Sequence, residues 1–147
     1  MIKGSCLCGG VKFQIKRAVG PFELCHCARC RKVSGSAFLP WLGVLREDFQ
    51  FTSGRELIRS YEAPLRDTPP AYRTSFCSRC GSQVPDPDST SPWFEIPPGA
   101  LDDDPDVRPD KHIYVDTKSP WYAITDELPQ LKKTEIRAFR EAHPDPR

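Results

Sequence analysis

Three short cysteine blocks decide how this chain folds: Cys6-Leu7-Cys8, Cys25-His26-Cys27-Ala28-Arg29-Cys30 and Cys77-Ser78-Arg79-Cys80. Together they contain all seven cysteines of the 147 residues. Seven cysteines cannot all pair as disulfides. The N-terminal residues carry no export signal, so we expect a cytoplasmic protein whose thiols stay reduced unless they serve metal binding or catalysis. The blocks therefore predict metal binding.

Two of the blocks have the spacing that is typical of zinc sites. In 27–30 and in 77–80, two residues separate the cysteines, which lets a tight turn aim both sulfurs at one Zn²⁺ about 2.3 Å from each. Gly81 and Gly9-Gly10 follow cysteines directly, where a chain that folds around a metal often needs a positive φ. Thiolates without neighbouring carboxylates favour zinc over magnesium or calcium.

Seven ligands divide most simply into four and three. A structural zinc is closed by four protein ligands, whereas a catalytic zinc keeps three and leaves one position open. The run 25–30 can supply three ligands, which leaves four cysteines to meet across the fold: Cys6, Cys8, Cys77 and Cys80. A second partition joins the cysteines of 27–30 with those of 77–80. Spacing gives the first partition only a small advantage, so both stay open at this point.

Short extended segments dominate the remaining sequence. Val11, Phe13 and Ile15 alternate with polar residues, as a half-buried strand does. Further segments bounded by Gly, Pro or Asp are predicted strands: Phe49–Phe51, Leu57–Tyr61, Ala71–Phe76, Trp93–Ile96 and His112–Val115. The 16 prolines argue against a helix bundle. Only the pattern from Leu128 to Phe139 predicts a helix. We expect a mainly β chain of short antiparallel strands with at most a short C-terminal helix, forming one domain over 1–135 and a tail over 136–147.

Charge and hydropathy exclude two classes of function. The formal net charge is +1, without the basic stripe that nucleic-acid binding needs. The longest apolar run, 37–45, contains Pro40 and is far shorter than the about 20 residues of a membrane-spanning helix. We expect neither a nucleic-acid partner nor a membrane partner.

Several motifs resemble those of the glutathione-dependent formaldehyde-activating enzyme family. They are Gly4-Ser5-Cys6-Leu7-Cys8-Gly9-Gly10-Val11, residues 25–38, Phe76-Cys77-Ser78-Arg79-Cys80-Gly81-Ser82, and His112-Ile113-Tyr114-Val115 with Pro120-Trp121. The resemblance implies a β-tent fold with two zinc ions per chain. It implies a structural zinc on Cys6, Cys8, Cys77 and Cys80, and a catalytic zinc on Cys25, Cys27 and Cys30. The implied activity, a carbon–sulfur lyase reaction, adds glutathione to formaldehyde. Resemblance at the zinc blocks does not fix the substrates.

Elementary electrostatics favours thiol chemistry at a three-thiolate zinc. Zn²⁺ with three thiolates has a formal charge of −1, so it activates bound water poorly, whereas a thiol in the fourth position is deprotonated on binding. We expect Arg31, Lys32 and Ser36 to bind the substrates, a glutathione-like thiol and a small carbonyl compound. A solvated basic patch and a simple turn are the alternatives for these residues.

The two histidines near the motifs are better explained as structural residues. If 25–27 is extended, His26 faces away from both flanking sulfurs. His112 begins a predicted strand and either packs there or contacts the active site. Two other functions stay open: a non-catalytic zinc-stabilised binding module, and a thiol-redox protein that uses Cys27 and Cys30 without the expected βαβ setting.

Overall fold

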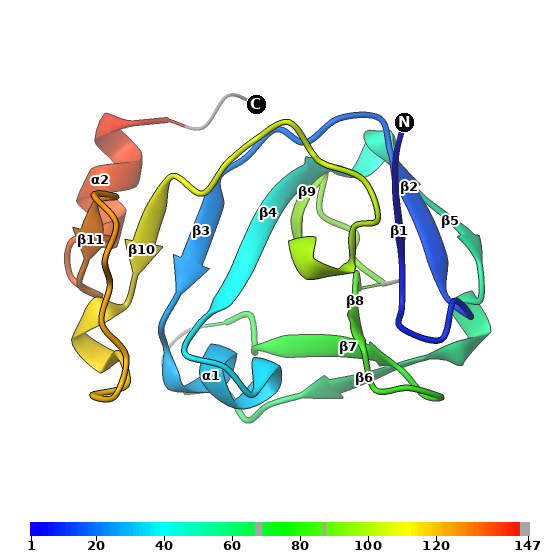
Figure 1. Ribbon diagram of the computed structural model, residues 1–147, viewed down its shortest axis with the longest axis horizontal. Helices are drawn as coiled ribbons and strands as arrows, with labels where there is room; N and C mark the ends of the chain where they lie inside the picture. Colours follow the sequence, from blue (N-terminus) through cyan, green and yellow to red (C-terminus); the bar gives the residue numbers. More distant parts are fainter. Residues whose placement is uncertain (67–68, 87, 145–147) are drawn as a thin grey trace.

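Three small β-sheets form the framework of the molecule, as Figure 1 shows. The computed structural model describes residues 1–66, 69–86 and 88–144. The first sheet is antiparallel with order β1-β2-β5, formed by β1 (Ile2–Ser5), β2 (Lys12–Ile15) and β5 (Phe49–Ser53). The third has order β6-β7-β8, formed by β6 (Ile58–Glu62), β7 (Arg73–Cys77) and β8 (Gln83–Val84). The expected mainly β fold is confirmed.

The second sheet is the largest and has order β11-β10-β3-β4-β9. Its strands are β3 (Phe22–Cys25), β4 (Leu39–Leu45), β9 (Trp93–Ile96), β10 (Lys111–Ile113) and β11 (Gln130–Leu131). β10 runs parallel to both β3 and β11, so the expectation of antiparallel strands does not hold here. A long connection from β3 to β10 makes the parallel pairing possible, and such connections leave no local sequence signal.

The main core lies between the first two sheets. In β2 the side chains of Phe13 and Ile15 are buried while Lys12 is exposed, the alternation that the sequence predicts. The core consists of Phe13, Ile15, Leu42, Val44, Phe49, Phe94, Ile96 and Ala100. Two smaller buried clusters contain cysteines at core positions, one with Cys6 and Cys77 and the other with Cys25 and Cys30.

The helices are short and differ in part from the expectation. α1 (Ala28–Ser34) was not predicted; it begins after Cys27 and ends at Gly35, whose φ is 64°. The predicted helix from Leu128 to Phe139 is wrong in extent. Leu131 belongs to β11, where it pairs with Ile113 of β10, and only α2 (Ile136–Ala142) is helical. Single 3₁₀ turns complete the structure: η1 (Arg46–Asp48), η2 (Arg55–Leu57), η3 (Pro98–Ala100) and η4 (Val115–Thr117).

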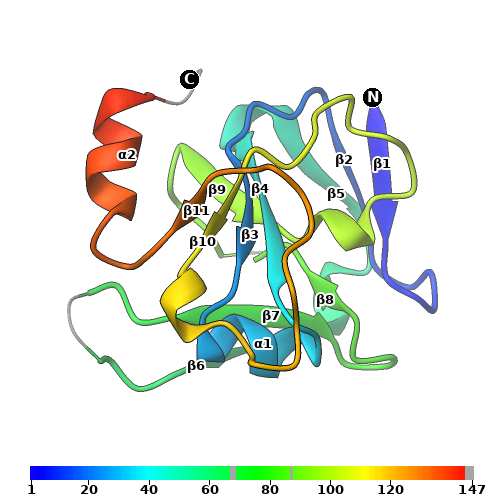
Figure 2. The same ribbon diagram turned by 60° about the vertical axis from the view of Figure 1, so that its left-hand side comes forward.

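α2 lies beside the β11 and β10 end of the second sheet (Figure 2). Its Ile136 is buried, and its Arg140 Nη2 lies 2.6 Å from Glu23 Oε2 in β3. Residues 136–142 thus pack on the domain, while a domain boundary after residue 135 stays a prediction. Across the described ranges, no helix is long and apolar enough to cross a membrane.

Candidate metal centres and the adjoining cavity

Four cysteine sulfurs meet between the turn after β1 and the end of β7. The Sγ atoms of Cys6, Cys8, Cys77 and Cys80 all lie within 4.8 Å of one another. Cys6 Sγ is 3.5 Å from Cys8 Sγ, which is 3.9 Å from Cys77 Sγ. Four sulfurs placed tetrahedrally about 2.3 Å from a common centre would be separated by about 3.8 Å. The donor set therefore fits a metal ion.

Glycine and serine shape the two turns that present these sulfurs. Gly9 (φ +69°) donates its N–H to Cys6 O, and Gly81 (φ +74°) donates to Cys77 O, both at 2.8 Å. The positive φ expected at Gly9 and Gly81 is confirmed, whereas Gly10, which the same expectation included, has no positive φ. Ser82 Oγ joins the turns, because it accepts from Leu7 N at 3.0 Å and from Cys80 Sγ at 3.3 Å. The cysteine spacing gave no signal for this role of Ser82.

The other three cysteines meet where β3 passes into α1. The Sγ atoms of Cys25, Cys27 and Cys30 also lie within 4.8 Å of one another. Cys27 Sγ accepts from Cys30 N at 3.4 Å, and Cys30 Sγ accepts from the indole Nε1 of Trp41 at 3.5 Å. No further His, Cys, Asp or Glu of the described chain joins this group. A metal held here would keep one coordination position for another ligand.

The three thiols lie close enough together to affect one another's ionisation. Hydrogen bonds from Cys25 and then Cys30 lower the pKa of Cys27 to about 2. The same contact with Cys27 raises the pKa of Cys25, and burial adds to that increase. Only one of the three can therefore ionise easily in the absence of a cation. A divalent metal would remove this mutual repulsion, so the group fits a metal ion as the four-cysteine cluster does.

His26 lies between two cysteines and is fully buried. Its Nε2 is 2.8 Å from Nδ1 of His112, and His112 Nε2 lies 3.0 Å from Asp126 Oδ2. The backbone N–H of His26 donates to Ile113 O at 2.9 Å. β10 thus supports the 25–27 segment through both main chain and side chains.

The three residues predicted to bind substrates lie on or just after α1. Arg31 donates from Nη1 to the buried Ser119 Oγ at 3.0 Å and from Nε to His26 O at 3.3 Å. Lys32 and Ser36 are exposed. None of the three lines the cavity described next, so their role in substrate binding stays a prediction.

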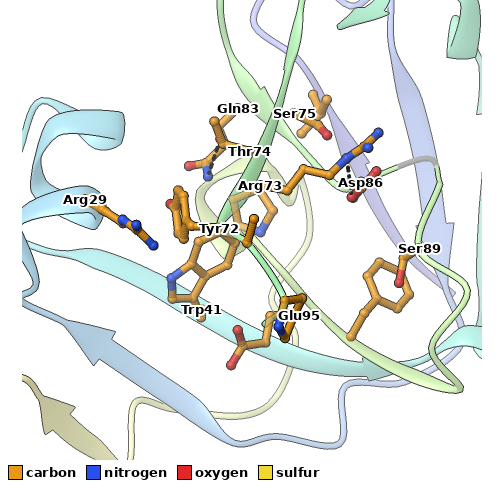
Figure 3. Close-up of a pocket in the computed structure, with 15 residues that line it drawn as sticks. Arg29, Trp41, Tyr72, Arg73, Thr74, Ser75, Gln83, Asp86, Ser89 and Glu95 are labelled. Atoms are coloured by element: carbon orange, nitrogen blue, oxygen red, sulfur yellow. Dashed lines mark hydrogen bonds and ion pairs between the residues drawn. The ribbon is translucent and has the colours of Figure 1, made fainter. Parts of the chain in front are cut away.

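A cavity of about 430 Å³ adjoins the three-cysteine group through two shared neighbours, Trp41 and Tyr72, although no cysteine lines it. Arg29, Trp41 and Tyr72 line it and come from α1, β4 and the segment before β7, as Figure 3 shows. Trp41 contacts Cys30 directly, and Tyr72 packs against the cluster that contains Cys25 and Cys30. The Arg29 guanidinium carbon lies 5.7 Å from the centre of the Tyr72 ring.

The cavity carries charges of both signs. Arg73 Nε lies 3.0 Å from Asp86 Oδ2, and both residues line the wall (Figure 3). Glu95 also lines it. Burial, and then the neighbouring thiols, raise the pKa of Tyr72, so its phenol is neutral. The second cysteine block contains Arg29, but no sequence pattern places it beside Trp41 or Tyr72. Only the folded chain brings these residues together.

Comparisons with known proteins agree on one family. A family model described as "Glutathione-dependent formaldehyde-activating enzyme" matches residues 1–117. A curated protein of Halomonas elongata, whose name provisionally assigns it to glutathione-dependent formaldehyde activation, is 29% identical over 127 residues, covering 84% of this chain and 81% of its own. The crystal structure of a Rhodobacter sphaeroides protein superimposes with a TM-score of 0.52 at 18% identity, covering 87% of this chain and 98% of that one. This last likeness concerns the fold alone.

Proposed function

The chain belongs to the glutathione-dependent formaldehyde-activating enzyme family, and from that premise we propose that it adds a small thiol, glutathione or a relative, to a small carbonyl compound such as formaldehyde. The reaction belongs to the carbon–sulfur lyase class. One observation carries the proposal: three convergent cysteine sulfurs, without a fourth protein ligand in the described chain, adjoin a cavity with charged and aromatic walls.

The proposal includes two zinc ions per chain. Cys6, Cys8, Cys77 and Cys80 would hold a structural zinc, and Cys25, Cys27 and Cys30 a catalytic one. All-sulfur donor sets of this size favour zinc among the common divalent ions. Bound at the three-cysteine site, zinc would keep the sulfur of the incoming thiol as a thiolate, which is the nucleophilic form.

The protein side chains bind and orient the substrates. The thiol loses its proton, its sulfur bonds to the carbonyl carbon, the carbon–oxygen π electrons move to oxygen, and the oxygen takes up one proton. Arg29 is the cavity cation nearest in sequence to the cysteines, and it can attract a carboxylate of the thiol. The Trp41 indole N–H faces Cys30 Sγ at 3.5 Å and disperses negative charge there.

The structure favours this function over the two alternatives. A non-catalytic zinc module would need a fourth ligand at the three-cysteine group, from the chain itself or from a partner, and none of the described residues of the chain supplies one. A thioredoxin-like redox motif would need parallel strands around the helix, whereas β3 and β4 are antiparallel. All seven cysteines are free thiols. A cytoplasmic location, where thiols stay reduced, belongs to the same proposal.

The test is zinc X-ray absorption spectroscopy of the zinc-loaded protein with and without glutathione. We expect one additional sulfur ligand per chain when glutathione is added, because the thiol occupies the open position. S-methylglutathione, which has no free thiol, is the matched control and should leave the spectrum unchanged. An unchanged sulfur shell with glutathione would refute the proposal. The rate of hemithioacetal formation, measured by NMR exchange against the uncatalysed reaction, then establishes catalysis.

A further inference from the structure

Tyr72 lines the cavity, and its hydroxyl oxygen lies close to the Cys30 side chain but has no partner in hydrogen-bonding geometry among the residues that the structure describes. The oxygen is buried even though the residue as a whole is only half-buried. The Tyr72 backbone is fixed, because its carbonyl accepts from Ala63 N at 2.8 Å. Its ring is held between the Cys25 and Cys30 cluster and the Arg29 guanidinium.

An unpaired buried hydroxyl is destabilising, since it gives up its hydrogen bonds to water and receives none in return. Phenylalanine would fill the same space without this cost. The ring alone can supply the packing against the cysteines and the contact with Arg29. The hydroxyl therefore needs an explanation other than packing, and its position beside the three sulfurs suggests a ligand atom as its partner.

We propose that the Tyr72 hydroxyl donates a hydrogen bond to the oxygen atom of the carbonyl substrate while the carbon–sulfur bond forms. The inference rests on the proposed function and adds a residue to it. As sulfur attacks carbon, negative charge develops on this oxygen, and a fixed donor in a water-poor wall stabilises that charge. Tyr72 keeps its proton throughout. The proton that neutralises the oxygen is the one that the thiol released on binding, returned through solvent.

A pair of small thiols tests the contact without any turnover. Mercaptoethanol is a stable stand-in for the hydroxymethyl adduct, because it carries a hydroxyl close to its sulfur, and ethanethiol lacks that hydroxyl. Titration calorimetry on zinc-loaded protein gives the ratio of the two dissociation constants. Because the two thiols also differ in acidity, the informative quantity is the change of this ratio between wild type and Tyr72→Phe. We expect the preference for mercaptoethanol to fall by about fivefold, the size of one neutral hydrogen bond.

Rate and stability measurements complete the test. Tyr72→Phe should lower kcat for hemithioacetal formation by about a hundredfold with little change in KM for the thiol. Its zinc content should stay the same and its melting temperature should stay or rise. Tyr114→Phe is the matched control, since Tyr114 packs against the same cysteines but does not line the cavity; it should leave the rate unchanged.

The outcomes distinguish a failure of the proposed function from a failure of the role given to Tyr72. If neither small thiol binds to the wild-type protein although glutathione does, only the inference about Tyr72 is wrong; if glutathione does not bind either, the proposed function is wrong and this inference falls with it. If both thiols bind and Tyr72→Phe weakens them equally, only the role of Tyr72 is wrong. A loss of zinc or a lower melting temperature in Tyr72→Phe would show that the hydroxyl supports the cysteines, and this too would overturn the inference.

Discussion

Arg29 shows how one residue of the Cys27–Cys30 spacer can serve the cavity. Its Nη2 donates to Pro64 O at 2.9 Å, and its guanidinium lies against the Tyr72 ring. These contacts hold a cation in the cavity wall beside the cysteines. A zinc ion with three cysteine thiolates and a bound substrate thiolate would have a formal charge of −2, so a nearby cation is electrostatically favourable there.

The contacts of Arg29 lead to a prediction about glutathione binding. Arg29→Ala should raise the dissociation constant of glutathione by about tenfold to a hundredfold, the value of a charge-assisted contact. Lys32→Ala tests the earlier expectation for the exposed face of α1 and should have a smaller effect, because Lys32 does not line the cavity. Calorimetric titration of glutathione into both zinc-loaded variants measures the two dissociation constants. A larger loss in Lys32→Ala would place the carboxylate on the outer face of α1.

The histidine pair leads to a second prediction at this scale. His112→Phe should lower the free energy of unfolding by about 1–3 kcal/mol, because it leaves Nε2 of the buried His26 without its partner. Asp126→Ala should lower the free energy of unfolding by a smaller amount, since Asp126 is 45% exposed and water can take its place beside His112. Chemical denaturation of the zinc-loaded proteins gives both values. Equal stability of wild type and His112→Phe would mean that the pair does not support the 25–27 segment.

At the scale of elements, a buried charge cluster fixes α2 to the second sheet. Glu23 in β3 is 1% exposed and lies 3.4 Å from the buried Lys111 Nζ of β10 and 2.6 Å from Arg140 Nη2 of α2. Removing one member of a buried pair is costly because it leaves the other charge without compensation. Three elements therefore depend on one carboxylate.

Glu23→Ala should accordingly destabilise the protein by about 3 kcal/mol. Arg137→Ala is the matched control on the same helix. Arg137 is 91% exposed and forms an ion pair with Glu141 one turn away, which predicts a change below about 0.5 kcal/mol. Thermal and denaturant unfolding compare the two variants. Similar losses would contradict a special role of the Glu23 cluster.

The elements also show what the sequence could predict. β2, β5, β6, β7, β9 and β10 lie within one or two residues of the predicted segments, because each has alternating or bounded apolar residues. β1, β3, β4, β8 and β11 were not predicted. The two residues of β11, for example, are ordered by pairing with β10 and not by local preference. The cysteine groups were recognisable from local spacing and family resemblance. Arg29, Trp41 and Tyr72 come from three separate segments, so no local pattern could identify the cavity.

At the scale of the whole molecule, the two cysteine groups differ in what they connect. The four-cysteine group joins the turn after β1 to the end of β7, and so connects the first sheet to the third (Figure 1). The three-cysteine group is local to β3 and α1. Loss of metal from the first group would separate distant segments, whereas loss from the second would disturb one helix start. The two sites should therefore differ in their effect on folding.

This difference gives a prediction for the intact protein. Purified without chelator, the chain should carry two zinc ions, one for each cysteine group. A graded chelator should remove the zinc of the three-cysteine site first and abolish thiol binding while the fold remains, because that ion has one protein ligand fewer. Cys30→Ser should reproduce this state, with one zinc and a nearly unchanged melting temperature. Cys77→Ser should unfold or aggregate, since binding of the structural zinc is part of the folding free energy. Elemental analysis and thermal unfolding of both variants decide it: iron in place of zinc, or equal damage by both substitutions, would contradict the division into one structural and one catalytic site.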